Sequence, residues 1–152
     1  MTRTFHHTLR AGYGDTDKSG VVHHAVYLRY LEDARVELLR SLGLDFARLE
    51  DEERVSLVVA AASLRYRRPA RFDDLLVVEI RVGRLLGASV RLDCRVLRPP
   101  PASGAPAPEA PETEPLVEAE ITLACVDLDT LRPKRLPFRP TLERWLAEGA
   151  RG

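Results

Sequence analysis

A turn-rich segment that leads into a long amphipathic pattern decides the fold of this chain. Residues 13–24 read YGDTDKSGVVHH, and residues 25–42 continue as AVYLRYLEDARVELLRSL. The first part is dense in turn residues and predicts a loop. In the second part apolar side chains recur every three or four residues, which predicts one buried helix stripe. The stripe consists of Tyr27, Tyr30, Leu31, Ala34, Leu38 and Leu42. Gly43 is a typical C′ residue, so we expect the helix to end there.

Alternation of apolar and polar side chains with a period of two predicts three strands in the second half of the chain. The mixed residues 5–13 and the apolar run that becomes basic at Arg65 predict two more, so one expected strand precedes the helix, over residues 5–13, and four follow it. The four are residues 55–68, 75–82, 88–98 and 116–126. One polar face per strand indicates an antiparallel sheet with its apolar side on the helix, and the short link 83–87 predicts a hairpin. The fold class is therefore α+β, with a five-stranded antiparallel sheet and one long central helix.

The length of 152 residues indicates a single domain over residues 1–152. Residues 99–115 contain seven of the eleven prolines and predict a flexible hairpin insert. The acidic segment 44–54 predicts a short helix or a loop. Residues 138–147 predict a short helix anchored by Trp145.

Composition limits the classes of function. Lys plus Arg and Asp plus Glu number 23 each, so no basic field indicates a nucleic-acid partner. No apolar run approaches the roughly 20 residues of a membrane span, and the N-terminal residues lack the apolar core of a signal peptide. We expect a cytoplasmic protein in which Cys94 and Cys125 are buried, reduced thiols.

The loop before the helix has the groups that acyl chemistry needs. An ordinary Asp has a pKa of about 3.9, so Asp17 would be ionised at neutral pH. It could attack an activated acyl carbon or deprotonate a water molecule. Amides in the first turn of the helix could bind the oxyanion that forms. Without such chemistry, Asp15 and Asp17 would simply be turn formers.

A metal site is not expected in this loop. Asp15, Asp17 and Ser19 resemble the opening of a calcium loop, but such a loop needs a carboxylate at its twelfth position, where this chain has Val26. The histidines lack the spacing of a zinc site. We expect neither a metal nor an organic cofactor.

The pattern of residues in and around this loop resembles the motif of a known family, the hotdog-fold acyl-CoA thioesterases of the 4-hydroxybenzoyl-CoA thioesterase type. The resemblance is greatest to the bacterial branch associated with the Tol-Pal cell-envelope cluster. It rests on Tyr13, Asp15, Thr16, Asp17, Gly20, Val21, Val22, His24 and Tyr27, followed by Glu32, Ala34 and Arg35. It resumes at Tyr66, Pro69, Ala70, Asp73 and Asp74.

The resemblance implies roles for individual residues. Asp17 would be the catalytic carboxylate, as nucleophile or as general base. Tyr13 and His24 would line the catalytic site, and a backbone amide near His24 would polarise the thioester carbonyl. Val22 and Tyr27 would contact the substrate, while Asp15 and Gly20 would shape the loop.

The resemblance also implies partners. Family members form homo-oligomers, as dimers or dimers of dimers, with sites between subunits. By charge alone, Arg65, Arg67 and Arg68 could bind the phosphates of coenzyme A, or they could form a solvated strand end.

The sequence therefore predicts a homo-oligomeric acyl-CoA thioesterase that releases a carboxylate and free CoA. Two alternatives stay open. One is a thioesterase acting on an acyl carrier protein, and the other is a non-catalytic hotdog module that binds acyl-CoA.

Overall fold

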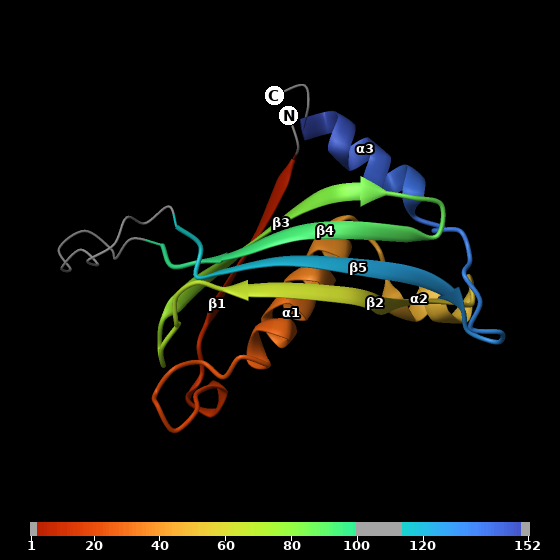
Figure 1. Cartoon of the computed structure of the whole chain (residues 1–152). Helices are drawn as coiled ribbons and strands as arrows, with labels where there is room; N and C mark the ends of the chain where they lie inside the picture. The colour runs from red at the N-terminus through yellow and green to blue at the C-terminus, as the bar shows by residue number, and fades with distance from the viewer. Residues whose placement is uncertain (1–2, 100–113, 150–152) are drawn as a thin grey trace.

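A curved antiparallel sheet holds one long helix against its concave side (Figure 1). The computed structural model describes residues 3–99 and 114–149, so nearly all of the predicted insert 99–115 lies outside the described residues. The helix is α1 (Val26–Ser41). The five strands are β1 (Thr4–Arg10), β2 (Val55–Tyr66), β3 (Leu75–Leu85), β4 (Ser89–Leu97) and β5 (Val117–Asp127). They pair in the order β1-β3-β4-β5-β2. The expected α+β architecture is confirmed.

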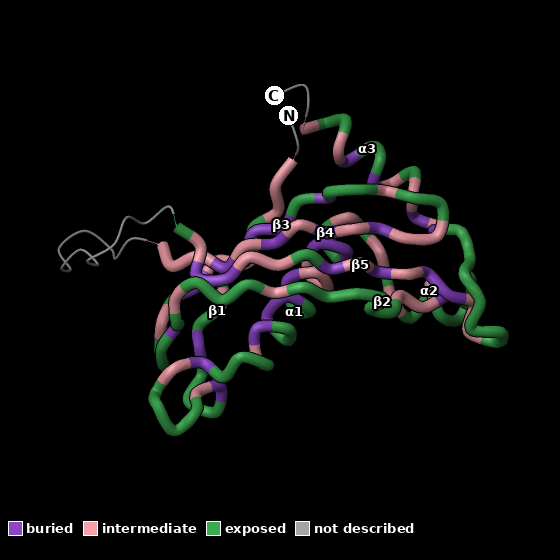
Figure 2. Tube along the Cα trace, viewed as in Figure 1, coloured by how far each residue is buried: buried purple, intermediate pink, exposed green. Residues whose placement is uncertain are grey.

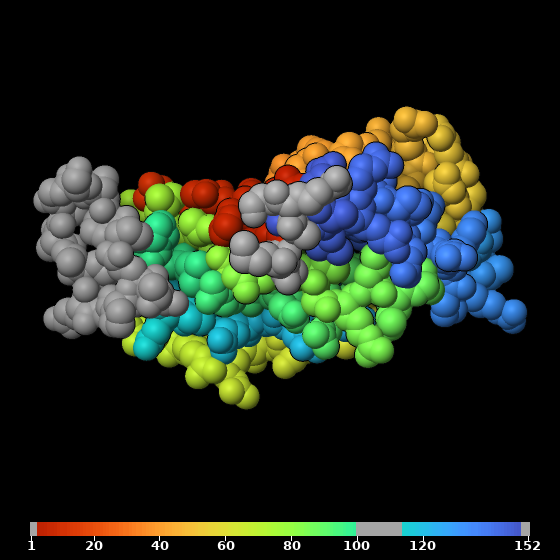
Figure 3. Space-filling view, turned by 90° about the horizontal axis from the view of Figure 1, so that it is seen from above, coloured from red at the N-terminus to blue at the C-terminus, as the bar shows by residue number. Residues whose placement is uncertain are grey.

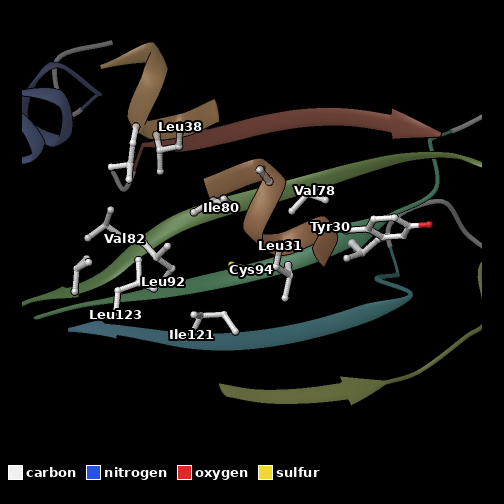
Figure 4. Close-up of a cluster of buried hydrophobic side chains, with 14 of the residues drawn as sticks. Tyr30, Leu31, Leu38, Val78, Ile80, Val82, Leu92, Cys94, Ile121 and Leu123 are labelled. Atoms are coloured by element: carbon white, nitrogen blue, oxygen red, sulfur yellow. The ribbon is translucent and has the colours of Figure 1, made fainter. Parts of the chain in front are cut away.

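The core lies between α1 and the inner face of the sheet. The predicted helix stripe is buried, except that Leu42 is half-buried and Leu39 joins the core. Strand β4 buries alternate residues, as the period of two predicts. Strand β3 does the same from Leu76 to Val82, except that Glu79 is also buried. Figure 4 shows side chains of both layers meeting, among them Leu31 and Leu38 from α1 and Ile80 and Leu92 from the sheet. Burial of this apolar surface is the main term that stabilises the fold.

Strand β2 differs from the other strands because it lies at an edge and most of it is exposed (Figure 2). The exposed fractions of Val58 and Val59 are 42% and 52%. No charged residue precedes Arg65 in this twelve-residue strand. It therefore presents a long apolar edge, unlike the seven-residue strand β1 at the other edge.

Two short helices complete the described fold. In α2 (Phe46–Asp51), the N-cap Asp45 accepts a hydrogen bond from the amide of Ala47 at 2.9 Å. In α3 (Arg139–Gly149), Trp145 is buried as predicted, and the guanidinium of Arg3 lies 5.0 Å from its ring centre. Figure 3 shows α3 beside the beginning of the chain.

Three predicted strand ends were wrong by two residues or more. Strand β3 continues to Leu85, three residues beyond the predicted end at residue 82. Strand β1 ends at Arg10 rather than at residue 13, because Ala11 exchanges backbone hydrogen bonds with Asp73 and Asp74. Tyr13–Asp15 then form a short 3₁₀ turn. Strand β2 ends at Tyr66, because the amides of Arg67 and Arg68 both donate to the carbonyl of Leu116.

Candidate active site

The predicted loop before α1 is a small hairpin with Asp17 at its turn. Thr16 pairs with Val22 across it. The amide of Asp17 donates to the carbonyl of Val21 at 2.9 Å, and the amide of Gly20 donates to the carbonyl of Asp17 at 3.0 Å. Gly20 has a φ of +79°, a left-handed conformation that favours glycine. The hairpin thus fixes the backbone on both sides of Asp17.

The carboxylate of Asp17 is held at the surface. Its Oδ1 accepts a hydrogen bond from the amide of Ser19 at 2.8 Å, and the residue is exposed. This bond orients the carboxylate. Asp17 is therefore available to a ligand from solvent.

Residues 69–74, the segment between β2 and β3, support the hairpin. The amide of Val22 donates to the carbonyl of Ala70 at 2.8 Å, and Val21 pairs with Arg71. The amide of Ala70 in turn donates to the hydroxyl of Tyr27 on α1 at 3.1 Å. Loop, connection and helix are thereby joined.

Asp15 anchors the hairpin to α1. The residue is 8% exposed, and its carboxylate accepts hydrogen bonds from the amide of Gly12 at 2.8 Å, the hydroxyl of Tyr30 at 2.7 Å and the guanidinium of Arg29. Burial by itself would raise the pKa of Asp15, but these three donors outweigh it and hold the pKa below its usual value. Asp15 is thus an ionised structural anchor beneath the loop.

The beginning of α1 combines an occupied carbonyl with an open amide. The carbonyl of His24 accepts a hydrogen bond from the hydroxyl of Tyr66 at 2.9 Å. Nδ1 of His23 accepts from the amide of Ala25 at 3.2 Å. Within residues 3–99 and 114–149, the amide of His24 has no hydrogen-bond acceptor. His24 directly precedes the N-cap residue Ala25, and an unpaired donor beside the positive end of a helix can bind an anionic oxygen.

The other predicted site residues differ in how far they are exposed to solvent. Tyr13 is 81% exposed, and its ring meets that of Phe72 edge to face at 5.5 Å. Val22 and Tyr27 are buried, at 4% and 2% exposure. The ring of Tyr27 packs against Tyr66, 5.6 Å away between centroids. In this chain Val22 and Tyr27 are buried side chains on which the loop packs.

The three predicted arginines are not equivalent. Arg67 forms an ion pair with Glu118 at 2.7 Å, and Arg68 forms one with Glu114. Arg65 is exposed and has no ion-pair partner among the described residues. Arg65 is thus the one of the three whose charge is open to a ligand.

Reasoning from the sequence missed the residues that hold the loop in place. Tyr66 belongs to the quoted resemblance, but its contact with His24 spans 42 residues of sequence. Tyr30 was predicted only as part of the apolar stripe, and its hydroxyl bond to Asp15 gave no periodic signal. Tyr30 is buried, and a buried tyrosine needs a partner for its hydroxyl, which is the one clue that its residue type offers. Tyr66 is 48% exposed, so its residue type gives no such clue.

No group of three or more His, Cys, Asp or Glu side chains among residues 3–99 and 114–149 is placed to hold a metal ion. No helix of the described part is long and apolar enough to cross a membrane. Cys94 and Cys125 are buried free thiols.

Comparisons with known proteins identify the family of this chain. A family model described as "Thioesterase-like superfamily" matches residues 11–146, which include the hairpin, α1 and all of β2–β5. The chain belongs to the thioesterase-like superfamily. It is therefore a member of a family of thioester hydrolases, and the expected hotdog fold is confirmed.

Individual relatives agree over most of the chain. The acyl-CoA thioesterase YbgC of Haemophilus influenzae is 35% identical over 88% of this chain and 88% of its own length. The acyl-CoA thioester hydrolase YbgC of an Escherichia coli strain is 34% identical over 90% of this chain and 92% of its own. The crystal structure of a probable thioesterase from Bartonella henselae superimposes with a TM-score of 0.76 at 31% identity, over 89% of this chain and all of that one.

Proposed function

We propose that this protein is an acyl-CoA thioesterase that releases a carboxylate and free CoA. The observation that carries the proposal is the docked hairpin, where an exposed, oriented carboxylate and an unpaired helix-start amide belong to one rigid loop. The names of the YbgC relatives support an acyl-CoA substrate. The motif resemblance further supports the 4-hydroxybenzoyl-CoA thioesterase type and the Tol-Pal-associated branch, and the free thiols of Cys94 and Cys125 support a place in the cytoplasm.

Asp17 supplies the reactive carboxylate in one of two ways. As a nucleophile, it attacks the thioester carbon, expels the CoA thiolate and forms an anhydride that water then cleaves. As a general base, it accepts a proton from the water that attacks the same carbon. In both routes the carbonyl oxygen becomes negative and accepts a hydrogen bond from the amide of His24. Loss of one such donor typically costs on the order of 10² to 10³ in rate.

The surroundings of Asp17 suit a thioester substrate. Tyr13 and the ring of His24 border the exposed side of the loop, where an acyl-CoA would approach. Arg65 keeps an open charge near the end of β2, which suits a phosphate of CoA. Its side chain leaves the face of the sheet opposite to that of Tyr66, so a phosphate would bind it around the edge of β2. Arg67 and Arg68 would first have to leave Glu118 and Glu114.

The edge strand β2 supports a homodimer. A long apolar strand with a free edge tends to pair with another strand, and pairing with the β2 of a second copy would form an isologous interface with a twofold axis. Such a dimer brings the ends of β2, and with them Tyr66 and the helix start, close to the partner subunit. A dimer of dimers can form from this unit.

Release of free CoA tests the proposed function directly. The purified protein is mixed with a panel of aliphatic and aromatic acyl-CoA esters and with the matching acyl carrier protein esters. The free thiol is then measured with a chromogenic disulfide. We expect turnover of the CoA esters. Turnover of the carrier-protein esters alone would favour the first alternative, and tight binding of CoA esters without cleavage would favour a binding module.

A further inference from the structure

A largely apolar pocket lies between α1 and the sheet, next to the candidate active site. Its volume is about 230 Å³. An aliphatic cavity of about 150 Å³ is known to hold benzene, so this pocket has room for a ring or a short acyl chain. Figure 4 shows Leu31, Leu92, Cys94 and Ile121, which belong to its wall, gathered between the helix and the sheet.

The pocket begins about one helical turn, or 6 Å along the helix axis, beyond His24. Leu28, in the first turn of α1, lines it on one side, and Ala62 of β2 lines it on the other. Four residues beyond Ala62, Tyr66 binds the carbonyl of His24. From Leu28 the pocket extends to Arg35, which is seven residues or about 10 Å further along the helix axis. An acyl group bonded at the helix start would therefore extend towards Arg35.

Arg35 is a poorly compensated charge in this apolar wall. Its side chain is 13% exposed, and its nearest acidic group, Glu32, lies 3.6 Å away with a side chain that is 61% exposed. Burial lowers the pKa of Arg35 below its usual value. Its guanidinium donates no hydrogen bond to any residue in the described ranges. Buried charges are ordinarily paired and hydrogen-bonded. The nitrogens of Arg35 are not fully enclosed, since Arg91 Nε is the one enclosed side-chain donor without a partner among the described residues, so they are open to a ligand oxygen.

The neighbouring thiol of Cys94 is not a hydrogen-bond partner for Arg35, and it does not react with the substrate. Cys94 lines the same pocket, and burial raises its pKa to about 12. The thiol is therefore neutral at physiological pH, when it is a weak nucleophile and a weak acceptor. Glu32 and Arg35 are the two charged residues of the pocket wall, and of these Arg35 alone carries hydrogen-bond donors.

We propose that Arg35 is a specificity-determining residue, which binds an oxygen acceptor at the distal end of the acyl group. The inference rests on the proposed thioesterase function. A guanidinium has donors only, so it favours a hydroxyl or carboxylate oxygen at that position. A wholly apolar acyl group would leave the charge without a partner, and sites of this kind discriminate strongly against such analogues.

The test compares esters that differ only at the distal carbon. We would measure kcat/KM for hexanoyl-CoA, 6-hydroxyhexanoyl-CoA and adipoyl-CoA with the wild type, with Arg35→Met and with Arg40→Met. Arg40 lies on the same helix but is exposed and pairs with Glu37, so Arg40→Met is the matched control. The wild type should prefer at least one oxygenated ester about tenfold or more. Arg35→Met should reduce that preference by about tenfold or more, and Arg40→Met should keep it. The two oxygenated esters distinguish a hydroxyl from a carboxylate ligand.

Other outcomes are decisive as well. The proposal is overturned if the wild type prefers hexanoyl-CoA, or if Arg35→Met lowers kcat/KM equally for all three esters. If Arg35→Met does not fold, as judged by circular dichroism, Arg35→Lys should show the reduced preference, because lysine lacks the guanidinium fork. If the wild type cleaves no ester, the proposed function fails. Calorimetry then still tests Arg35, because tighter binding of an oxygenated ester than of hexanoyl-CoA supports its role and equal binding contradicts it.

Discussion

At the scale of single residues, Asp15 and Asp17 are two carboxylates with different surroundings. Asp15 is buried and accepts three hydrogen bonds, whereas Asp17 is exposed and accepts one from its own turn. A carboxylate surrounded by donors is stabilised in its charged form and is a poor base. Asp17 keeps free lone pairs for a substrate. The surroundings therefore indicate that Asp15 anchors the loop and that Asp17 is the carboxylate available for the reaction.

The anchor can be tested with Tyr30→Phe. The substitution removes the hydroxyl that donates to Asp15 at 2.7 Å, and a hydrogen bond to a charged group contributes about 1.5 to 3 kcal/mol. We expect the free energy of unfolding at pH 7, measured in urea, to fall by about that amount. Tyr13→Phe is the matched control, because the hydroxyl of the exposed Tyr13 makes no hydrogen bond within the described residues.

The pH dependence of Tyr30→Phe has a defined sign. The folded-state pKa of Asp15 is depressed, so its stabilising contribution is present above its unfolded pKa of about 3.9 and is lost as the pH falls through the lower, folded value. The difference between wild type and Tyr30→Phe should therefore shrink below about pH 4. A difference that grows on acidification would contradict the assignment of Asp15 as an ionised anchor.

At the scale of elements, the turn of the hairpin positions Asp17. Gly20→Ala places a Cβ on a residue with a φ of +79°, which costs about 1 kcal/mol for a non-glycine residue. Because Gly20 closes the turn around Asp17, we expect a loss of thioesterase activity that is larger than this loss of stability explains. Gly14→Ala is the control, since neither residue has a heavy atom within 4 Å of the added Cβ and only Gly20 has a positive φ. Equal activities of the two variants, measured as CoA release, would show that turn geometry does not matter.

Helices and strands whose apolar residues repeat regularly could be predicted from the sequence. The order of the strands in the sheet could not. The helix stripe from Tyr27 to Leu38 and the alternation in β4 report which side of each element is buried, and the structure agrees. Alternation does not report which strands are neighbours. β2 therefore gave no signal that it pairs with β5 at the edge, where partners such as Val55 and Asp127 are more than 70 residues apart in sequence.

The candidate active site likewise combines features that were predictable from the sequence with features that were not. The hairpin turn was predictable because Gly20 and the two aspartates are local signals. The supports from Tyr66, Tyr30 and Arg29 were not, because each is a contact between separate elements. Likewise, the ends of β1 and β2 were missed because the bonds that terminate them come from distant carbonyls and amides.

At the scale of the whole molecule, β2 should mediate self-association. Lysines on an edge strand oppose pairing, and across a twofold axis each one meets like charges on the other copy. We expect a Val58→Lys, Ala60→Lys double variant to shift the mass measured by light scattering from a dimer or larger to a monomer. Thr8→Lys on the opposite edge strand β1 should keep the wild-type mass. A wild-type mass for both variants would exclude β2 as the interface.

The central claim is that the carboxylate of Asp17 carries out thioester hydrolysis, and Asp17→Asn tests it most directly. An asparagine Oδ1 can still accept the amide of Ser19, so the turn should persist while the charge is lost. Asp45→Asn is the control, because it makes the same change at a turn position at the N-cap of α2, where asparagine caps equally well. Steady-state release of CoA from the preferred ester should fall by a factor on the order of 10² to 10⁴ in Asp17→Asn and stay at the wild-type rate in Asp45→Asn. A folded Asp17→Asn variant with the wild-type rate would contradict the account.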